Sequence, residues 1–311
     1  ALIHQFIHIP WPSSSYWLLL PEVMRRSICS SLCHADIVGF QTSRDVRAFL
    51  ESVEAFLPEA EVDHQKRAIV FDGNETLVKS YPISIDVEEV RRIAASPRAK
   101  DYDHFIRPLL GEKTIVRVDR AEPSKNIVRG FQAYDLLLER YPELRGTVKF
   151  LAFLVPSRTH IRQYERYLND IHLLVDTINE KYSTGHWRPI EVYYENNYTQ
   201  AIAAMKLYDV LLVNSVIDGM NLVAKEGPIV NTKNGVLILS EAAGAHEQLQ
   251  PGCLSIAPAD IEGTVRTLHQ ALTMNHKERK QRSKELVGSI EREDIAHWLQ
   301  EQLADIGTLP Q

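Results

Sequence analysis

The chain has 311 residues, of which 24% are charged and 44% hydrophobic, and its formal net charge is −6. Such an acidic chain lacks the broad basic surface that binding to a phosphate backbone needs, so we expect no nucleic-acid partner. Its apolar runs are far shorter than the roughly 20 residues of a membrane span, and its three cysteines cannot form a disulfide framework. These features predict a soluble, cytoplasmic protein with two packed units.

The chain opens on an apolar segment, Leu2–Ile9, that is predicted to be a buried strand. It has neither the charged region nor the cleavage site of a signal peptide, and a chain that starts within a strand is expected to have lost an upstream portion. Short apolar runs then alternate with amphipathic helices, which is typical of parallel sheets covered by helices. The further strands are expected at Ile37–Phe40, Thr114–Val118, Lys149–Leu154, Ile190–Tyr194, Val210–Asn214, Val236–Ser240 and Cys253–Ile256.

Helical periodicity is clearest at residues 46–57 and 161–178, where apolar side chains recur every three to four positions. Between these regions, Asp72-Gly73-Asn74 separates two short strand candidates, Ala68–Val70 and Thr76–Lys79. An Asp-Gly pair between such runs predicts a hairpin turn.

We place a domain boundary near residues 88–100, because the segment Ser96–Asp103 is polar and contains Pro97. Residues 96–290 hold about six strand–helix units, enough for a complete doubly wound, Rossmann-like domain. Residues 1–95 hold too few elements and are predicted to form the second half of a partner domain of the same kind. Two such α/β domains facing a cleft would place a ligand at the carboxyl ends of their strands.

The densest polar cluster follows the predicted strand Val210–Asn214 and leads into a helix expected to start at Gly219 or Met220. A strand–turn–helix junction suits an anionic ligand, and Gly219 lets the backbone approach it closely. Asp218 precedes the helix, so its alternative role is an N-cap. Glu226 lies two turns later and can accept hydrogen bonds from a vicinal diol such as a ribose, or else belongs to a solvated helix face.

Other candidate side chains also follow predicted strands. Arg120 and Lys125 come after Thr114–Val118 and can clamp a diphosphate, unless they are two solvated cations of a surface loop. His8 ends the first strand, where it either faces the cleft or serves as a structural hydrogen-bonding residue. Arg158 follows the strand that ends at Leu154. Together with the Asp218–Glu226 cluster they fit a phosphorylated sugar or nucleotide sugar, and no Ser-His-Asp or metal-ligand set competes with them.

Several motifs occur in order along the chain: His8-Ile9-Pro10-Trp11-Pro12, Gly39-Phe40-Gln41-Thr42, Tyr81-Pro82-Ile83-Ser84-Ile85, Asp218-Gly219-Met220-Asn221-Leu222-Val223-Ala224-Lys225-Glu226, Gly235-Val236-Leu237-Ile238-Leu239-Ser240 with Ala243-Gly244-Ala245, and Asp294-Ile295-Ala296-His297-Trp298. Together they resemble glycosyltransferase family 20, the retaining trehalose-6-phosphate synthases. The resemblance covers almost the whole length, and the nine residues from Asp218 resemble the family's donor-site signature.

The resemblance implies a GT-B fold of two Rossmann-like domains around an active site, the N-terminal one incomplete here. Residues 1–95 would belong to the acceptor side, residues 96–290 would bind the nucleotide sugar, and residues 291–311 would form a helix crossing back to the N-terminal domain. The implied reaction of trehalose biosynthesis moves glucose, with retention, from a nucleotide-glucose such as UDP-glucose to glucose 6-phosphate. It needs no metal or other cofactor and no membrane partner, and the family's frequent assembly suggests a homo-oligomer.

The family also implies a role for each candidate side chain by matching position. Arg120 and Lys125 would hold the donor diphosphate, and His8 and Asp218 would contact the transferred glucose. Arg158 would reach the acceptor phosphate. Glu226 would bind the ribose hydroxyls, assisted by the backbone of Gly219, Met220, Asn221 and Leu222.

The sequence departs from the family pattern in three places. The family's opening portion is absent, Glu122 and Asn126 replace an aspartate and a glycine, and Gly227-Pro228 replaces Tyr-Val after Glu226. Pro228 lacks an N–H group and is expected to disturb the helix. The alternatives are therefore a relative with another acceptor (a glucosylglycerol-phosphate synthase or a cyclitol-coupling pseudo-glycosyltransferase) or a catalytically silent regulatory domain that binds a sugar phosphate.

Overall fold

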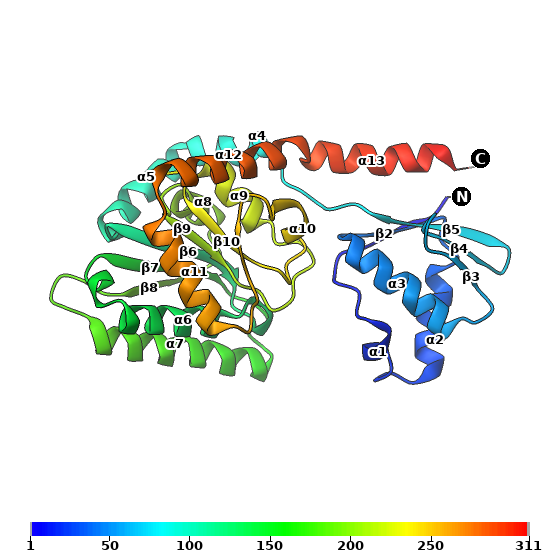
Figure 1. Ribbon diagram of the computed structural model, residues 1–311, viewed down its shortest axis with the longest axis horizontal. Helices are drawn as coiled ribbons and strands as arrows, with labels where there is room; N and C mark the ends of the chain where they lie inside the picture. The colour runs from blue at the N-terminus through cyan, green and yellow to red at the C-terminus, as the bar shows by residue number, and fades with distance from the viewer. Residues whose placement is uncertain (1, 310–311) are drawn as a thin grey trace. The chain divides into compact units, whose positions relative to one another are not determined.

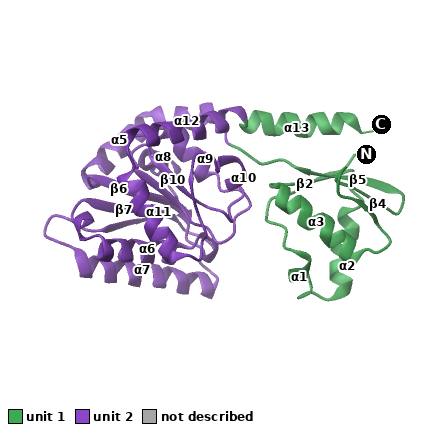
Figure 2. Ribbon diagram, viewed as in Figure 1, with its two compact units in different colours: residues 1–84, 293–311 green, residues 85–292 purple. Residues whose placement is uncertain are grey.

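Two separate sheets form in the computed structural model, which describes residues 2–309 (Figure 1). They belong to two units: unit 1 holds the residues up to Ser84 together with those from Glu293 onward, and unit 2 holds Ile85–Arg292 (Figure 2). The predicted α/β class is confirmed. Within the described residues, no helix is long and apolar enough to cross a membrane.

Unit 2 is built on a six-stranded sheet in which all neighbouring strands are parallel. The strands are β6 (Lys113–Arg120), β7 (Val148–Val155), β8 (Ile190–Tyr194), β9 (Val210–Val213), β10 (Val236–Ser240) and β11 (Leu254–Ile256). Their spatial order is β11-β10-β9-β6-β7-β8. Successive strands therefore run outward from β6 to β8, and the chain then returns to β9 on the other side of β6. This reversal is the topological switch point, the place where doubly wound sheets bind ligands.

Helices cover both faces of this sheet (Figure 1). On one face lie α6 (Ile127–Arg140), α7 (Arg162–Tyr182) and α11 (Ile261–Thr273), and on the other lie α5 (Pro97–Ile106), α8 (Tyr198–Met205), α9 (Val223–Val230) and α12 (His276–Arg292). The remaining helices of unit 2 are α4 (Val87–Ala95) and the short α10 (His246–Leu249). Because both faces are covered, β9 and β10 are buried throughout and β7 is nearly so, which explains the continuous apolar runs in their sequences.

Unit 1 has a mixed five-stranded sheet in the order β1-β2-β5-β4-β3. Its strands are β1 (His4–Ile7), β2 (Ile37–Phe40), β3 (Glu61–Asp63), β4 (Ala68–Phe71) and β5 (Asn74–Ser80), and its helices are α1 (Ser14–Trp17), α2 (Glu22–Leu32), α3 (Ser43–Phe56) and α13 (Ile295–Thr308). The hairpin prediction is confirmed: β4 and β5 are antiparallel, and both loop residues, Asp72 and Gly73, have positive φ.

The expected boundary near Pro97 differs from the structure. The chain passes from unit 1 to unit 2 between Ser84 and Ile85, and Pro97 is the first residue of α5 rather than part of a linker. The Ser96 side chain caps this helix by accepting a hydrogen bond from the Ala99 N–H. A proline at the first helical position loses no helical hydrogen bond, so a Ser-Pro pair marks the helix start.

Candidate functional site

Two loops meet at the carboxyl ends of β6 and β9, on either side of the switch point. The Val216 N–H donates to the Ser124 carbonyl over 2.9 Å, and the Asn214 amide donates to the Asn126 carbonyl over 3.0 Å. In return, the Asn126 amide donates to the Asn214 carbonyl over 2.9 Å. The loops after β6 and β9, which both hold predicted site residues, are thus joined by three hydrogen bonds.

Asn126 explains one departure from the family pattern. Its φ of 58° lies in the left-handed region, which glycine adopts freely and asparagine tolerates better than most residues. Its amide also donates to the Pro258 carbonyl, after β11, over 2.7 Å. The asparagine therefore keeps the turn that a glycine would form and adds bonds to two further loops.

A fully buried arginine of β6, Arg117, binds to both of these loops from within the sheet. The Arg117 guanidinium donates to the Asp119 carboxylate over 2.7 Å, to the Lys125 carbonyl over 3.0 Å and to the Asn214 side chain over 3.1 Å. A Cβ atom on Gly130 would lie 2.6 Å from this guanidinium, so glycine leaves the space it needs. Burial raises the pKa of Asp119, and the adjacent Arg117 opposes that shift. Neither Arg117 nor Asp119 was expected at the site. The one signal that marks them in the sequence is that two charged residues alternate with apolar ones in β6.

The two predicted cations differ in their surroundings. The Lys125 ammonium contacts the Asp218 carboxylate at 2.5 Å, and the residue is only 8% exposed. Arg120 is paired with the buried Glu122 at 3.1 Å, but 56% of its side chain is exposed. Glu122 also accepts hydrogen bonds from the hydroxyls of Ser124 and Ser157. Lys125 is therefore not a solvated surface cation, whereas Arg120 is paired with Glu122 and still exposed to solvent.

Asp218 is not an N-cap, which corrects one alternative. Besides Lys125, its carboxylate accepts from the Asn221 amide over 3.0 Å and lies 3.3 Å from the Ser215 hydroxyl. Helix α9 begins at Val223 and not at Gly219 or Met220, because Asn221 has a φ of 77° that no α-helix can include. The Asn221 side chain accepts from the Ala224 N–H and so caps the helix instead.

Glu226 lies on α9 and is 9% exposed. Its carboxylate accepts a hydrogen bond from the Tyr198 hydroxyl, on α8, over 2.9 Å. Burial raises the pKa of Glu226, and this hydrogen bond partly offsets the shift. The alternative of a solvated helix face is therefore wrong. Tyr198 carries no motif, so the sequence offered no sign of this pairing.

These side chains surround a hollow of about 200 Å³ at the switch point. Its wall combines charged and apolar residues from β6, the β6–α6 loop, α8 and the start of α9: Val118, Asp119, Arg120, Lys125, Tyr198, Ala201, Met205, Asn221, Leu222, Val223 and Glu226. Five of the predicted residues, Arg120, Lys125, Asn221, Leu222 and Glu226, thus line one space. Asp218 joins them through Lys125. Gly219 lies between two residues that are bound to the next loop, since the Gly244 N–H donates to the Asp218 carbonyl and the Ala245 N–H donates to the Met220 carbonyl.

Pro228 lies inside α9, which continues from Val223 to Val230, so the expected disturbance does not end the helix. The residue before it accounts for the local packing. A Cβ atom on Gly227 would lie 2.3 Å from Leu211 of β9, so only glycine lets α9 approach the sheet this closely.

Two predicted residues are not among those that line this hollow. Arg158 has a φ of 43° in the exposed loop after β7, where its guanidinium donates to the Tyr164 hydroxyl over 3.0 Å. His8 is exposed and belongs to unit 1, where its ring lies 4.7 Å from that of Phe6. Their assigned roles remain predictions.

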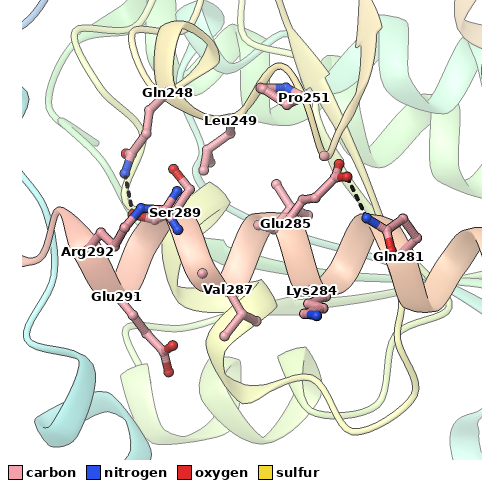
Figure 3. Close-up of a pocket in the computed structure, with 13 residues that line it drawn as sticks. Gln248, Leu249, Pro251, Gln281, Lys284, Glu285, Val287, Ser289, Glu291 and Arg292 are labelled. Atoms are coloured by element: carbon pink, nitrogen blue, oxygen red, sulfur yellow. Dashed lines mark hydrogen bonds between the residues drawn. The ribbon is translucent and has the colours of Figure 1, made fainter.

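Unit 2 also has a larger hollow, of about 600 Å³, between α12 and the segment Gln248–Gly252 (Figure 3). The Gln248 amide donates to the Ser289 carbonyl at one end of it, and the Gln281 amide donates to Glu285 at the other. None of the predicted site residues lines this hollow. The larger volume does not make this hollow the better candidate site. The charged side chains converge on the smaller hollow, which lies at the switch point.

Known proteins resemble the chain over nearly its whole length. A family model described as glycosyltransferase family 20 matches residues 1–308. A trehalose-6-phosphate synthase of Sodalis glossinidius (strain morsitans) is 34% identical over 310 residues, which are 98% of this chain and 64% of that protein. The chain thus spans less than two thirds of that relative's length.

Solved structures share the fold. One, described as "Trehalose-6-phosphate from E. coli bound with UDP-2-fluoro glucose", has a TM-score of 0.89 and 30% identity and covers 99% of this chain and 68% of its own. Another is an alpha,alpha-trehalose-phosphate synthase (UDP-forming) from Burkholderia xenovorans in complex with glucose-6-phosphate. It has a TM-score of 0.91 and 30% identity and covers 98% of this chain and 68% of its own. These likenesses confirm the predicted GT-B type of fold.

Proposed function

The chain belongs to glycosyltransferase family 20, and we propose that it is a retaining glucosyltransferase. Its donor is a nucleotide-glucose, UDP-glucose, its acceptor is glucose 6-phosphate and its product is trehalose 6-phosphate. The observation that carries the proposal is the convergence of Arg120, Lys125 and Glu226 on one hollow at the switch point of unit 2. The ligands of the related structures, a UDP-sugar analogue and glucose-6-phosphate, support the same substrates.

The cations act on the leaving group. In the reaction the bond between the glucose C1 and the diphosphate oxygen breaks, and a bond from the acceptor hydroxyl to C1 forms on the same face. The departing diphosphate takes the proton of that hydroxyl. Arg120 and Lys125 stabilise the negative charge that grows on the diphosphate, and such preorganised charges commonly supply several kcal/mol of transition-state stabilisation. No metal or other cofactor is part of this proposal.

The Lys125 ammonium has two possible anionic partners, Asp218 and the donor diphosphate. The ammonium contacts the Asp218 carboxylate, and a bound diphosphate competes for the same ammonium. Asp218 can then accept a hydrogen bond from a hydroxyl of the transferred glucose, while Glu226 accepts hydrogen bonds from the ribose. His8 and Arg158 retain their proposed roles at the glucose and at the acceptor phosphate.

Titration calorimetry with UDP and UDP-glucose tests the proposal. Lys125→Ala should weaken UDP binding by about 1.5–3 kcal/mol, the scale for hydrogen bonds to charged groups. Lys233→Ala is a matched control, because Lys233 also contacts a buried aspartate, Asp209, at 2.5 Å but lies beyond the opposite end of β9. Equal losses in both variants would contradict the diphosphate site. Release of UDP from UDP-glucose in the presence of glucose 6-phosphate, absent with glucose alone, then tests the acceptor.

A further inference from the structure

Tyr198 reaches the proposed donor site from a different helix than the residues that the motif identifies. It occupies the first turn of α8, lines the hollow beside Glu226, and donates its hydroxyl hydrogen to one Glu226 oxygen, Oε1, over 2.9 Å. Glu226 is 9% exposed whereas Tyr198 is 44% exposed. The tyrosine hydroxyl therefore lies at the boundary between the buried carboxylate and the open hollow.

A buried glutamate needs a partner to remain both charged and oriented. Desolvation disfavours its charged form, and a hydroxyl that donates to the carboxylate favours it. A donor from a neighbouring element also restricts the rotation of the carboxylate group about its last side-chain bond. With Oε1 held by Tyr198, Oε2 remains available to a ligand hydroxyl, and Oε1 retains a second lone pair.

The position of Tyr198 is itself well defined. The Asn197 side chain caps α8 by accepting from the Gln200 N–H over 3.1 Å, and its amide donates to the Tyr102 hydroxyl of α5 over 2.6 Å. These two hydrogen bonds hold the start of α8, the helix that carries the Tyr198 hydroxyl.

We propose that Tyr198 is a positioning residue that holds Glu226 ready to accept hydrogen bonds from the two ribose hydroxyls of the nucleotide. The inference rests on the proposed function, because it names the part of the donor that this end of the hollow recognises. Tyr198 is thereby a determinant of specificity. Tyr198 and Glu226 together should distinguish a ribonucleotide from a deoxyribonucleotide, and neither residue should do so fully without the other.

The test is titration calorimetry of UDP and 2′-deoxy-UDP on the full 311-residue chain. The unaltered chain should bind UDP more tightly than 2′-deoxy-UDP. Tyr198→Phe should lose about tenfold in UDP affinity and leave 2′-deoxy-UDP binding nearly unchanged, so that the preference collapses. Glu226→Gln should lose the same preference, and the double variant should lose little more, because residues in one hydrogen-bond network are not additive.

Tyr182→Phe is the matched control. It removes a tyrosine hydroxyl that donates to the Asp135 carbonyl over 3.3 Å and touches neither α8 nor Glu226, so it should preserve the preference for UDP. A preference that survives in Tyr198→Phe, or that Tyr182→Phe abolishes equally, overturns the inference while leaving the donor site in place. If the unaltered chain binds no UDP at all, the proposed function fails, and this inference fails with it.

Discussion

Glu226 illustrates how a proposed binding residue can oppose stability. Burial raises its pKa above the usual 4.5, so the folded state holds its proton more tightly than the unfolded state does. The contribution of Glu226 to the free energy of unfolding is therefore greatest below the usual pKa of 4.5. It falls as the pH rises toward the raised pKa of the folded state. A carboxylate held at such a cost is typical of a group kept for a ligand.

Glu226→Gln should remove this pH dependence. Relative to the unaltered chain, the variant should gain stability as pH is raised from about 4 to 7, while its UDP affinity falls. Thermal unfolding of the two chains across that pH range measures the difference. A difference for Glu226→Gln that is constant with pH would show that its carboxylate titrates normally.

Asn126 combines two roles that substitution can separate. Asn126→Gly keeps the left-handed turn but loses the bonds to Asn214 and Pro258, and should lower the free energy of unfolding by about 1–3 kcal/mol. Asn126→Ala loses the same bonds and adds about 1 kcal/mol of backbone strain. Urea unfolding should therefore rank the alanine variant below the glycine variant, and the reverse order would refute the strain argument.

At the scale of elements, the sequence predicted most strands because those of unit 2 are buried on both faces and appear as apolar runs. The predicted strand ends at Val118, whereas β6 continues to Arg120. The prediction stopped early because Asp119 and Arg120 are polar. It began α9 too early because the positive φ of Asn221 is not visible in a helical pattern. A buried pair that spans distant segments, such as Arg117 with Asn214, depends on tertiary structure.

The same limit applies to the candidate site. The sequence could place Arg120, Lys125, Asp218 and Glu226 after strands or on a helix, and the parallel sheet then gathers them at one edge. The pairing of Lys125 with Asp218 and of Tyr198 with Glu226 joins loops or helices that lie far apart along the chain. Periodicity carries no information about such contacts.

Helix α9 is held against the sheet at one glycine. Gly227→Ala places a methyl group 2.3 Å from Leu211 and should cost about 1–3 kcal/mol of unfolding free energy, with a shift of the Glu226 end of the helix. Gly185→Ala is the control, because no atom lies within 4 Å of the added carbon. Urea unfolding and UDP titration should both show a loss in Gly227→Ala, and an unaffected variant would refute the close-packing argument.

At the scale of the whole molecule, each unit has its own hydrophobic core, and the last helix completes unit 1. The Trp298 indole of α13 donates to the Tyr81 carbonyl over 3.0 Å. The Tyr81 hydroxyl and the Lys79 ammonium in turn contact the Asp305 carboxylate at 2.8 and 3.2 Å. A segment from the end of the chain is thus bound to the end of β5.

Trp298→Ala should destabilise unit 1 by about 2 kcal/mol, from the lost ring packing and hydrogen bond, and leave unit 2 unchanged. Limited proteolysis in increasing urea can follow the two units separately. Leu299→Ala is the control, because the Leu299 side chain is half exposed. Equal destabilisation of both units by Trp298→Ala would show that they unfold as one.

Hydrogen–deuterium exchange with and without UDP-glucose can locate the donor site among the described residues. We predict that a saturating concentration slows exchange in residues 119–127 and 216–227, which form the switch-point loops, and at the start of α8. Exchange in residues 248–252 and 281–292, around the larger hollow in Figure 3, should not change. Protection confined to that larger hollow, or no protection anywhere, would contradict a donor site at the junction of β6 and β9.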